Sequence, residues 1–259
     1  MAPYSASAPS PTRVEVFAEL GSTNDEAMSR ARAGEPGPLW IVAARQTAGR
    51  GRQGRSWISP EGNLHASLLL TDPSSPALAA QLGFVAGVCL IDALREATGA
   101  GERIKLKWPN DALLDGAKIS GLLLEASQSL SGALAIVVGF GVNCAHHPEN
   151  LAYASADLSS FGPLANASAI QRAIDLHFRK WLAVWRRGEG FADIRGAWIA
   201  RAAGIGSTIS VVTPLARHSG RFTGIDSAGR LVLDGDSGQT SIDAGDVFLT
   251  PAIAGGRQT

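Results

Sequence analysis

Cysteine is scarce in this sequence, and neither sign of charge is in excess. The 259 residues include two cysteines, Cys89 and Cys144, which lack the spacing of paired metal ligands, and so few thiols are typical of a reducing compartment. Lysine plus arginine and aspartate plus glutamate each number 23, so the whole chain is no general binder of polyanions. No apolar run approaches the length of a membrane span. From these absences we expect a cytoplasmic protein that does not enter a membrane.

The chain has the composition of a folded protein with one large and one small domain. Hydrophobic residues make up 45% of it, enough to fill a core. Residues 1–11 are rich in Ala, Ser and Pro without the pattern of a signal peptide, and we predict a disordered tail there. Residues 12–204 carry long strand and helix patterns and are predicted to form the larger domain. Residues 205–251 switch to short alternating strands between glycine turns, which predicts a small β domain, and residues 252–259 a second tail.

One short run has a composition that a hydrophobic core does not explain. It reads Arg45-Gln46-Thr47-Ala48-Gly49-Arg50-Gly51-Arg52-Gln53-Gly54-Arg55-Ser56-Trp57 and holds four arginines and three glycines. No acidic residue lies between Glu35 and Glu61. Glycines let backbone N–H groups approach an anion, and guanidinium forks match carboxylate and phosphate oxygens. Composition alone leaves two interpretations open, an anion-binding loop or a solvated basic segment of the nucleic-acid-binding type.

The predicted elements around this run place it between two strands. Strands are predicted at 14–17, 39–43 and 63–70, so the arginine run connects the second to the third. A helix opens after Gly21 with Thr23 and Glu26 at the spacing of a capping box. A second, mostly buried helix is predicted over 76–97, and Cys89 falls on its apolar face as a core residue.

Further along, hairpins dominate the predicted sheet. The segment 103–108 alternates cations with apolar residues, and strands at 112–114, 118–126 and 133–138 are separated by turns at Asp115-Gly116 and Ser131-Gly132. Helical patterns cover 168–187 and 191–203. Consecutive hairpins predict a mixed or antiparallel sheet backed by helices, and therefore an α+β fold and not a doubly wound one.

Two more clusters of polar residues fall at predicted strand ends. Lys107-Trp108-Pro109-Asn110-Asp111 sets a cation, an amide and a carboxylate at one strand end, with Lys118 across the following hairpin. Gly139-Phe140-Gly141-Val142-Asn143 reads as a glycine-rich turn after a strand. Each cluster alone has an ordinary structural explanation, such as exposed lysines or a proline-terminated strand. Their coincidence at the ends of one sheet indicates a functional site.

In these motifs the chain resembles the biotin protein ligase family. The resemblance rests on Ser22-Thr23-Asn24, the Gly49 to Trp57 loop, Lys107 to Asp111, Lys118-Ile119-Ser120-Gly121 and Gly139 to Asn143. It implies a catalytic domain like that of class II aminoacyl-tRNA synthetases, followed by a small SH3-like β-barrel domain. The first predicted strand begins at Val14, which leaves no room for the helix-turn-helix domain of the bifunctional members, so the resemblance implies a monofunctional ligase without a DNA-binding domain.

The resemblance also implies a reaction, cofactors and partners. The enzyme would join the carboxylate of its substrate biotin to the α-phosphate of ATP, with Mg²⁺, and pass the biotinyl group of biotinyl-5'-AMP to a lysine of a biotin carboxyl carrier protein. A second copy of the chain is a further candidate partner. The carboxylate and the phosphates are both anions and repel each other on approach. Clustered cations and backbone donors reduce this repulsion, which is the main difficulty of this chemistry.

Site residues follow from the matching motifs, as the resemblance implies. The biotin-binding set is Ser22, Thr23, Asn24, Gln46, Gly49, Arg50, Arg52, Lys118 and Gly121. The set for ATP and the adenylate is Arg50, Arg52, Arg55, Trp57, Lys107, Asn110, Asp111, Lys118 and Asn143. Arg52, Lys118 and Asp111 are the predicted catalytic residues, and Asp111 is also the candidate ligand of Mg²⁺.

Three alternatives remain open at the level of sequence. A lipoate or octanoate ligase or transferase would share the fold, a nucleic-acid-binding module would use the Arg/Gly loop for another purpose, and a biotin sensor would bind without catalysis. His65 departs from the tyrosine or aliphatic residue that is more usual in the family. It is interpreted as a pocket-edge residue or, as for most single histidines on a strand, a structural one.

Overall fold

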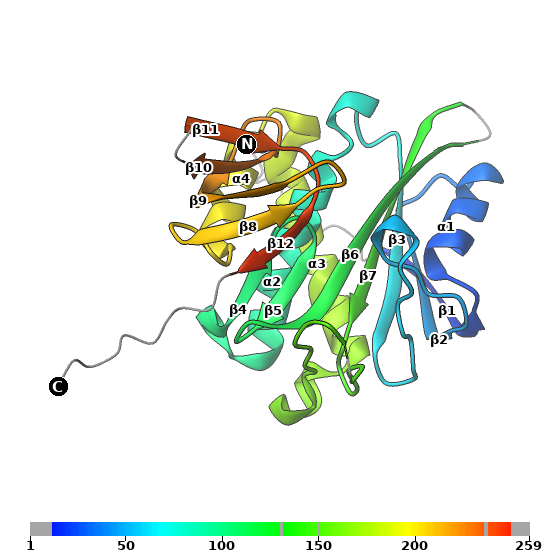
Figure 1. The fold of residues 1–259 in the computed structure, drawn as a ribbon. Helices are drawn as coiled ribbons and strands as arrows, with labels where there is room; N and C mark the ends of the chain where they lie inside the picture. Colours follow the sequence, from blue (N-terminus) through cyan, green and yellow to red (C-terminus); the bar gives the residue numbers. More distant parts are fainter. Residues whose placement is uncertain (1–11, 130–131, 150, 236–237, 250–259) are drawn as a thin grey trace, which may run out of the picture.

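The computed structural model describes residues 12–129, 132–149, 151–235 and 238–249 and contains two β-sheets with helices packed against the larger one (Figure 1). The predicted tails at 1–11 and 252–259 and Ser131 of a predicted turn lie outside these residues. The α+β class is confirmed. The predicted division of the chain at residue 204 stays a prediction.

The larger sheet has seven strands in the order β1-β2-β3-β7-β6-β5-β4. The strands are β1 Arg13–Leu20, β2 Leu39–Gln46, β3 Leu64–Thr71, β4 Ile104–Lys107, β5 Asp111–Leu114, β6 Ala117–Gln128 and β7 Leu134–Val142. β1 and β2 pair in parallel, and every other neighbouring pair is antiparallel, so the sheet is mixed as predicted. The predicted turn at Asp115-Gly116 is present, with both residues at positive φ.

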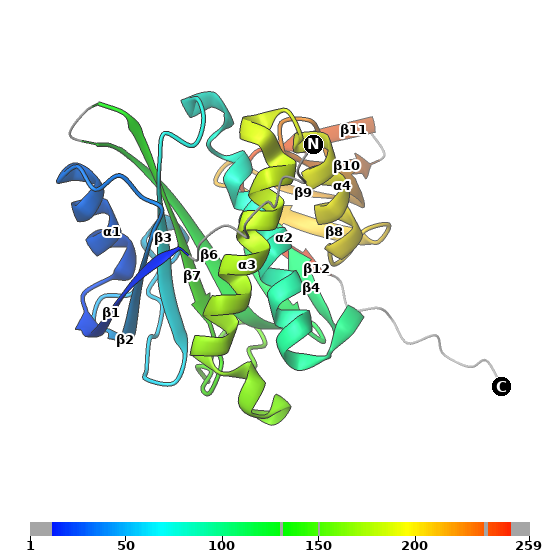
Figure 2. The same cartoon turned by 180° about the vertical axis from the view of Figure 1, so that it is seen from behind.

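Helices cover both faces of this sheet. α1 (Thr23–Arg32) packs on one face, where Ala27 and Ala31 meet apolar side chains of β2, β3 and β7. α2 (Gln81–Thr98) and α3 (Ala167–Trp185) cover the other face, with α4 (Phe191–Arg201) beside α2 (Figure 2). The short 3₁₀ segments are Arg52–Gly54, Pro76–Leu78, Gly101–Arg103, Ser159–Phe161, Pro163–Ala165 and Arg186–Gly188. No helix among the described residues has the length and apolar character needed to cross a membrane.

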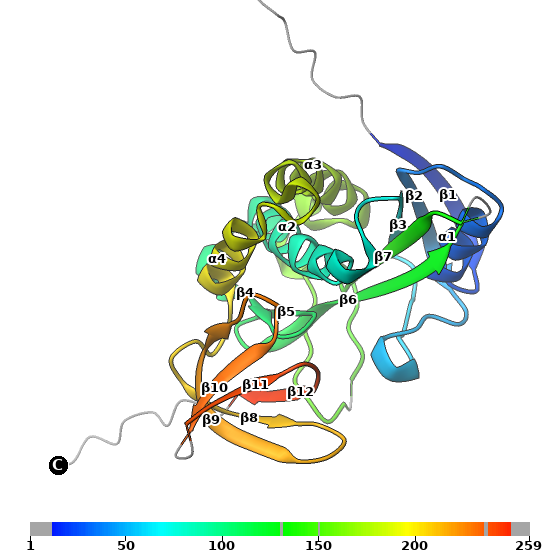
Figure 3. The ribbon, with the colours of Figure 1, turned by 90° about the horizontal axis from the view of Figure 1, so that it is seen from above.

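The smaller sheet has five antiparallel strands in the order β11-β10-β9-β8-β12 (Figure 3). They are β8 Thr208–Val212, β9 Arg217–Ile225, β10 Leu231–Gly235, β11 Gly238–Ile242 and β12 Asp246–Leu249. Their buried side chains join the core of the larger sheet, and Trp108 Nε1 donates a hydrogen bond to Gly229 O at 3.4 Å. The two sheets therefore share one apolar core.

Two local predictions were wrong in detail. Ser22, in extended backbone, is the N-cap of α1 and accepts from Asp25 N at 3.4 Å, whereas the sequence spacing favoured Thr23 with Glu26. Thr23 is already helical, and its hydroxyl is free to bond elsewhere. The Gly139 to Asn143 segment is not a turn after a strand, because β7 continues through Val142. A third difference is smaller: the helix predicted from residue 76 begins at Gln81, after a 3₁₀ turn.

Candidate active site

Strand register gathers the predicted residues on one face of the larger sheet. Along one row, His65 of β3 pairs with Gly141 of β7, Gly141 with Gly121 of β6, and Gly121 with Asp111 of β5. Because side chains alternate along strands, these residues share the face on which α1 packs. The two glycines of the row carry no side chain, so they leave a depression between α1 and the end of β5.

This depression is part of a cavity of ≈ 420 Å³. The arginine loop closes one side of it, and β12 of the smaller sheet contributes Asp246, Val247 and Phe248. The predicted site residues that line the cavity are Ser22, Thr23, Asn24, Gln46, Arg50, Arg52, Arg55, Trp57, Lys107, Asn110, Asp111, Lys118 and Gly121. Segments more than 200 residues apart thus meet at one cavity, because Ser22 and Val247 both line it.

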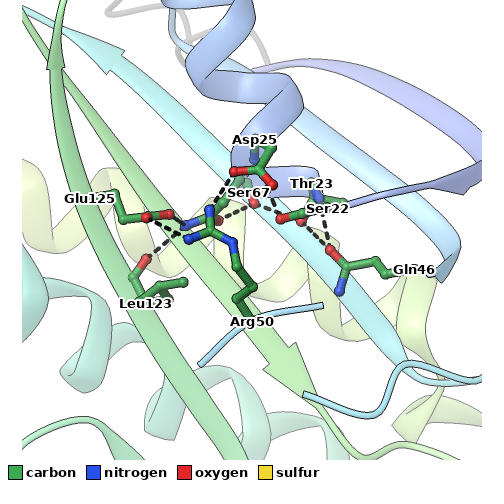
Figure 4. A network of polar contacts seen from close by, with 9 residues as sticks. Ser22, Thr23, Asp25, Gln46, Arg50, Ser67, Leu123 and Glu125 are labelled. Atoms are coloured by element: carbon green, nitrogen blue, oxygen red, sulfur yellow. Dashed lines mark hydrogen bonds and ion pairs between the residues drawn. The ribbon is translucent and has the colours of Figure 1, made fainter. Parts of the chain in front are cut away.

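One end of the cavity is an uncharged hydrogen-bonding cradle at the start of α1 (Figure 4). Gln46 Oε1 accepts from the backbone N of Thr23 at 2.8 Å and from its hydroxyl at 3.1 Å. Ser67 Oγ lies 2.7 Å from Thr23 Oγ1 and 2.5 Å from Asn24 Oδ1. Asn24 Nδ2 donates to Glu125 Oε2 at 2.7 Å. This cradle presents fixed donors and acceptors, which suits a neutral polar group such as a cyclic urea.

Arg50 ties the arginine loop to this cradle. Its guanidinium lies between Asp25 of α1 and Glu125 of β6, and Nη1 is 3.3 Å from Glu125 Oε1 (Figure 4). Burial lowers the pKa of Arg50, but the attraction of Glu125 and Asp25 outweighs it and the net pKa is raised. The predicted role of Arg50 as a grip on phosphate is therefore not favoured by the structure, because its charge is already paired.

The opposite end of the cavity is cationic. Lys118 Nζ lies 2.7 Å from Asp111 Oδ1, and Lys107 Nζ lies 3.9 Å from Asp111 Oδ2. Arg52 Nη1 donates to Asn110 Oδ1 at 3.4 Å and makes no ion pair with any described residue. Two lysines therefore share the carboxylate of Asp111, Arg52 adds a third positive charge, and cations outnumber carboxylates at this end of the cavity.

Burial lowers the pKa of two of these cations, Lys107 and Arg52. Burial lowers the pKa of Lys107 below its ordinary 10.5, more than the carboxylate of Asp111 raises it. The pKa of Arg52 is also lowered by burial, although a guanidinium stays charged at neutral pH. Half-buried cations with too few acidic partners are destabilised, and an anionic ligand would remove that cost.

Trp57 forms a wall between the two ends. A Cβ added at Gly141 would lie 2.6 Å from Trp57 Cε2, and one added at Gly121 would lie 3.4 Å from Trp57 Cζ3. The indole therefore rests flat against the bare backbone of β6 and β7. Its buried Nε1 has no hydrogen-bond partner among the described residues, so this donor is available to a ligand.

Gly141→Ala is expected to weaken biotin binding roughly tenfold or more, because the new methyl group displaces the Trp57 ring that walls the cavity. Isothermal titration calorimetry with biotin measures the effect. Gly83→Ala is the matched control, since a Cβ at that α2 position meets nothing within 4 Å. Equal biotin affinity in the two variants would show that Gly141 does not shape the binding wall.

Two predicted site residues do not line the cavity. Gly49 packs under the loop, where an added Cβ would lie 2.5 Å from Ser59 Oγ and from Trp57 O, so its place is conformational. Asn143 is buried, and its Nδ2 donates to Ala156 O at 3.1 Å. The structure therefore places Asn143 behind the cavity, where it holds a connecting segment.

Sequence reasoning missed two residues that line the cavity, Asp246 and Tyr153, and two acids, Asp25 and Glu125, that do not line it but pair with Arg50. Asp25, Glu125 and Asp246 neutralise arginines of the loop, and Tyr153 lies with its ring centroid 5.5 Å from Lys118 Nζ. Alternation along β6 puts Glu125 on the face of Gly121, a signal that the sequence did contain. Asp246 and Tyr153 carried no such signal, because their positions depend on long-range packing.

The same ion pairs bear on the nucleic-acid alternative. Arg45 pairs with Glu19 at 3.1 Å, Arg55 Nη1 with Asp246 Oδ1 at 3.1 Å, and Arg50 with two acids. A loop whose arginines bind the protein's own carboxylates offers little free charge to a polyanion. The observation that no acid is near in sequence did not mean that no acid is near in space.

His65 has the structural role that most single histidines have. It is buried, and its Nε2 donates to Pro60 O at 3.0 Å. Burial lowers its pKa, which keeps the ring neutral near neutral pH. His65 does not line the cavity, so the structure does not favour the pocket-edge interpretation.

The residues at the cationic end fit a Mg²⁺ ion that arrives with ATP. Among the described residues, no three His, Cys, Asp or Glu side chains gather where a metal ion could be held. The described lining of the cavity contains two carboxylates, Asp246, which is paired with Arg55, and Asp111, which is paired with Lys118 and follows Asn110 in the chain. Mg²⁺ in nucleotide sites uses one or two carboxylates and takes its other ligands from phosphates and water.

A neutral polar cradle joined to a cationic end by an aromatic wall suits a binding protein or enzyme whose ligands carry a neutral polar group and anionic groups. Known proteins agree with that class. The Biotin/lipoate A/B protein ligase family model matches residues 19–143, and the biotin protein ligase C terminal domain matches residues 204–250.

Individual relatives indicate the biotin ligases within this biotin and lipoate ligase family. The biotin--[acetyl-CoA-carboxylase] ligase of Paracoccus denitrificans is 43% identical over 240 residues, which cover 90% of this chain and 99% of that protein. The bifunctional ligase/repressor of Bacillus subtilis is 32% identical over 89% of this chain and 72% of its own length. The structure of biotin protein ligase from Aquifex aeolicus in complex with biotin and ATP has a TM-score of 0.78 and 26% identity, covering 91% of this chain and 97% of that one. The chain belongs to the biotin protein ligase family.

Proposed function

We propose that this chain activates biotin with ATP to give biotinyl-5'-AMP and pyrophosphate, and transfers the biotinyl group to a lysine of a biotin carboxyl carrier protein. The observation that carries the proposal is Arg52, a half-buried arginine at the cationic end that forms no ion pair with a described acid. A relative of this chain is named as a biotin ligase, and one related structure holds biotin and ATP together.

The cradle at the start of α1 is the proposed biotin site. Thr23, Asn24 and Gln46 would hold the ureido ring, because their donors and acceptors are already oriented by one another. Trp57 would flank the aliphatic chain of biotin, and the carboxylate would then reach Lys118. With biotin in this orientation, its carboxylate would lie at the boundary between the cradle and the cationic end.

The cationic end is the proposed site of the ATP phosphates. Arg52, Lys107 and Lys118 would offset the repulsion between the carboxylate and the α-phosphate, and Asp111 would keep Lys118 oriented and share Mg²⁺ with the phosphates. Mg²⁺ supplies charge neutralisation of the phosphates when it is bound. No enzyme nucleophile is required, since a carboxylate oxygen of biotin itself attacks the α-phosphorus.

The proposed function is tested by incubating the chain with ATP, Mg²⁺, a biotin carboxyl carrier domain and biotin, and detecting the product with streptavidin. A parallel reaction with lipoate distinguishes the lipoate ligases of the same fold. The proposal is supported if the carrier domain is modified in the reaction with biotin and not in the parallel reaction with lipoate. Modification of the carrier domain only in the lipoate reaction contradicts it. Pyrophosphate release in the presence of biotin excludes a sensor that binds without catalysis.

ATP use is expected to weaken at alkaline pH through Lys107. The pKa of Lys107 lies below 10.5 because of burial, so its positive charge is lost as the pH rises through that lowered value. The KM for ATP should therefore rise in the alkaline range, beginning below the pH expected for a lysine with the ordinary pKa of 10.5. In Lys107→Arg the guanidinium stays charged, and the rise should move to higher pH.

Biotin-dependent exchange of pyrophosphate into ATP, measured across this pH range, gives the two profiles. Lys105→Arg, on the same strand but outside the cavity lining, is the control and should leave the profile unchanged. If the KM for ATP rises at the same pH in Lys107→Arg and in the unmodified chain, Lys107 is not the group responsible for the rise.

A further inference from the structure

A second, smaller cavity opens from the active site beside Lys118. Its volume is ≈ 40 Å³. We call it the side groove, and its lining is Ser56, Trp57, Ile58, Lys118, Asn143, Pro148, Leu151, Tyr153 and Ser155. Four of these residues also line the main cavity, namely Ser56, Trp57, Lys118 and Tyr153. The side groove therefore adjoins the place where the biotin carboxylate and the α-phosphate would meet, because Lys118 and Trp57 lie between the two cavities.

The wall of the side groove is fixed by hydrogen bonds to β6. Lys118 N donates to Ala154 O at 2.8 Å, and Ala156 N donates to Lys118 O at 3.0 Å. Ser155 Oγ donates to Pro148 O at 2.6 Å. The segment that carries Leu151 and Tyr153 is thus held along the strand that carries Lys118.

At its outer end the side groove meets an exposed apolar surface. Ile58 is 57% exposed, Leu151 38% and Tyr153 51%. Single exposed apolar residues are common, but three around one opening next to a reaction site indicate contact with another molecule. Phosphates are a poor fit here, because Lys118 is the only charged side chain among the lining residues described.

We propose that the side groove admits the lysine side chain of the acceptor protein, and that Ile58, Leu151 and Tyr153 form the surface on which this protein docks. This inference rests on the proposed function, in which the acceptor lysine is the second substrate and the side groove is where it enters. The biotin cradle and the cationic end take up the rest of the cavity, which leaves the side groove as the approach to the acyl carbon. Apolar walls suit the methylene groups of a lysine, whose amine must reach Lys118.

The lining also favours the reactive form of that amine. Removal from water and the nearby ammonium of Lys118 both disfavour a second positive charge, so the incoming amine is driven toward its neutral form. The nitrogen lone pair then forms the C–N bond to the acyl carbon. The acyl C–O bond to the AMP phosphate breaks, its electron pair stays on the departing phosphate oxygen, and the nitrogen loses one proton to water.

The test compares Ile58→Glu and Leu151→Glu in the full chain. A carboxylate on the docking surface must be desolvated on contact, so the KM for the biotin carboxyl carrier domain is expected to rise about tenfold. Biotin-dependent pyrophosphate exchange without carrier should stay near the level of the unmodified chain. Release of biotin hydroxamate with hydroxylamine, a nucleophile too small to need the docking surface, should stay there as well.

Leu215→Glu is the matched control, because Leu215 is 97% exposed and lies between β8 and β9, outside the side groove. It should behave as the unmodified chain in all three measurements. An unchanged carrier KM in both groove variants overturns the inference, and so does a parallel loss of pyrophosphate exchange, which would assign the groove to adenylation. Absence of exchange in the unmodified chain would overturn the proposed function, and the inference with it.

Discussion

Replacement of Lys118 by methionine is expected to slow biotin-dependent adenylate formation by on the order of 10²- to 10³-fold. Lys118 is the cation between the biotin cradle and the phosphate end, with Nζ 2.7 Å from Asp111 and 5.6 Å from the Trp57 ring centroid. Methionine keeps most of the volume and removes the charge that offsets repulsion between the carboxylate and the α-phosphate. It also leaves Asp111 without its nearest cation, which adds to that repulsion.

The rate is measured as biotin-dependent pyrophosphate exchange at saturating ATP. Lys118→Arg, which keeps the charge but changes the geometry, should recover part of the activity. Lys180→Met, on the exposed face of α3, is the control for loss of a lysine as such. Thermal unfolding of all variants separates a folding defect from a chemical one. Exchange by Lys118→Met within about twofold of the unmodified chain would exclude Lys118 from the activation step.

Arg52→Ala is expected to lower adenylate formation about 100-fold and to raise the KM for ATP. Among the four arginines of the run from Arg45 to Trp57, Arg52 is the one without an ionic partner in the described part of the chain, so its charge is available to the substrates. Removal of a half-buried unpaired cation should leave the folded state no less stable, because its burial is unfavourable without the ligand. Activity and stability should therefore change independently.

The matched control is Arg45→Ala, in the last residues of β2 just before the arginine loop. Arg45 pairs with Glu19 and does not line the cavity, so its loss should change exchange kinetics little. Pyrophosphate exchange and thermal unfolding, compared across the two variants, test the assignment. Equal kinetic losses would mean that the loop acts through its total charge and not through Arg52.

The arginine loop and the strand ends could be predicted because their signals are local. Alternation before Trp108 and the Asp115-Gly116 turn are set by backbone preferences over a few residues. Lys107, Asp111 and Lys118 follow from that pattern, because the β4–β5 hairpin sets Lys107 opposite Asp111 and the β5–β6 hairpin brings Lys118 onto the neighbouring strand. The predicted mixed sheet is confirmed for the same reason, as consecutive hairpins leave few other pairings.

The partners of the loop arginines could not be predicted in this way. Asp25, Glu125 and Asp246 reach Arg50 or Arg55 across 25, 75 and 191 residues of sequence. Their approach depends on how α1, β6 and β12 pack, which no local pattern encodes. The choice of Ser22 over Thr23 as the N-cap has the same origin, because the hydroxyl of Thr23 is bound by Gln46 of β2.

The sequence by itself determined the two chemistries of the site, an excess of cations in one loop and one hairpin, and amides and hydroxyls at the start of one helix. Only the tertiary structure decided which cation is free. Sheet register set Gly121 and Gly141 side by side under Trp57, and the packing of α1, β6 and β12 neutralised Arg50 and Arg55 but not Arg52. The physical reason is that charge is a property of each residue, whereas its neutralisation depends on distances fixed by the whole fold.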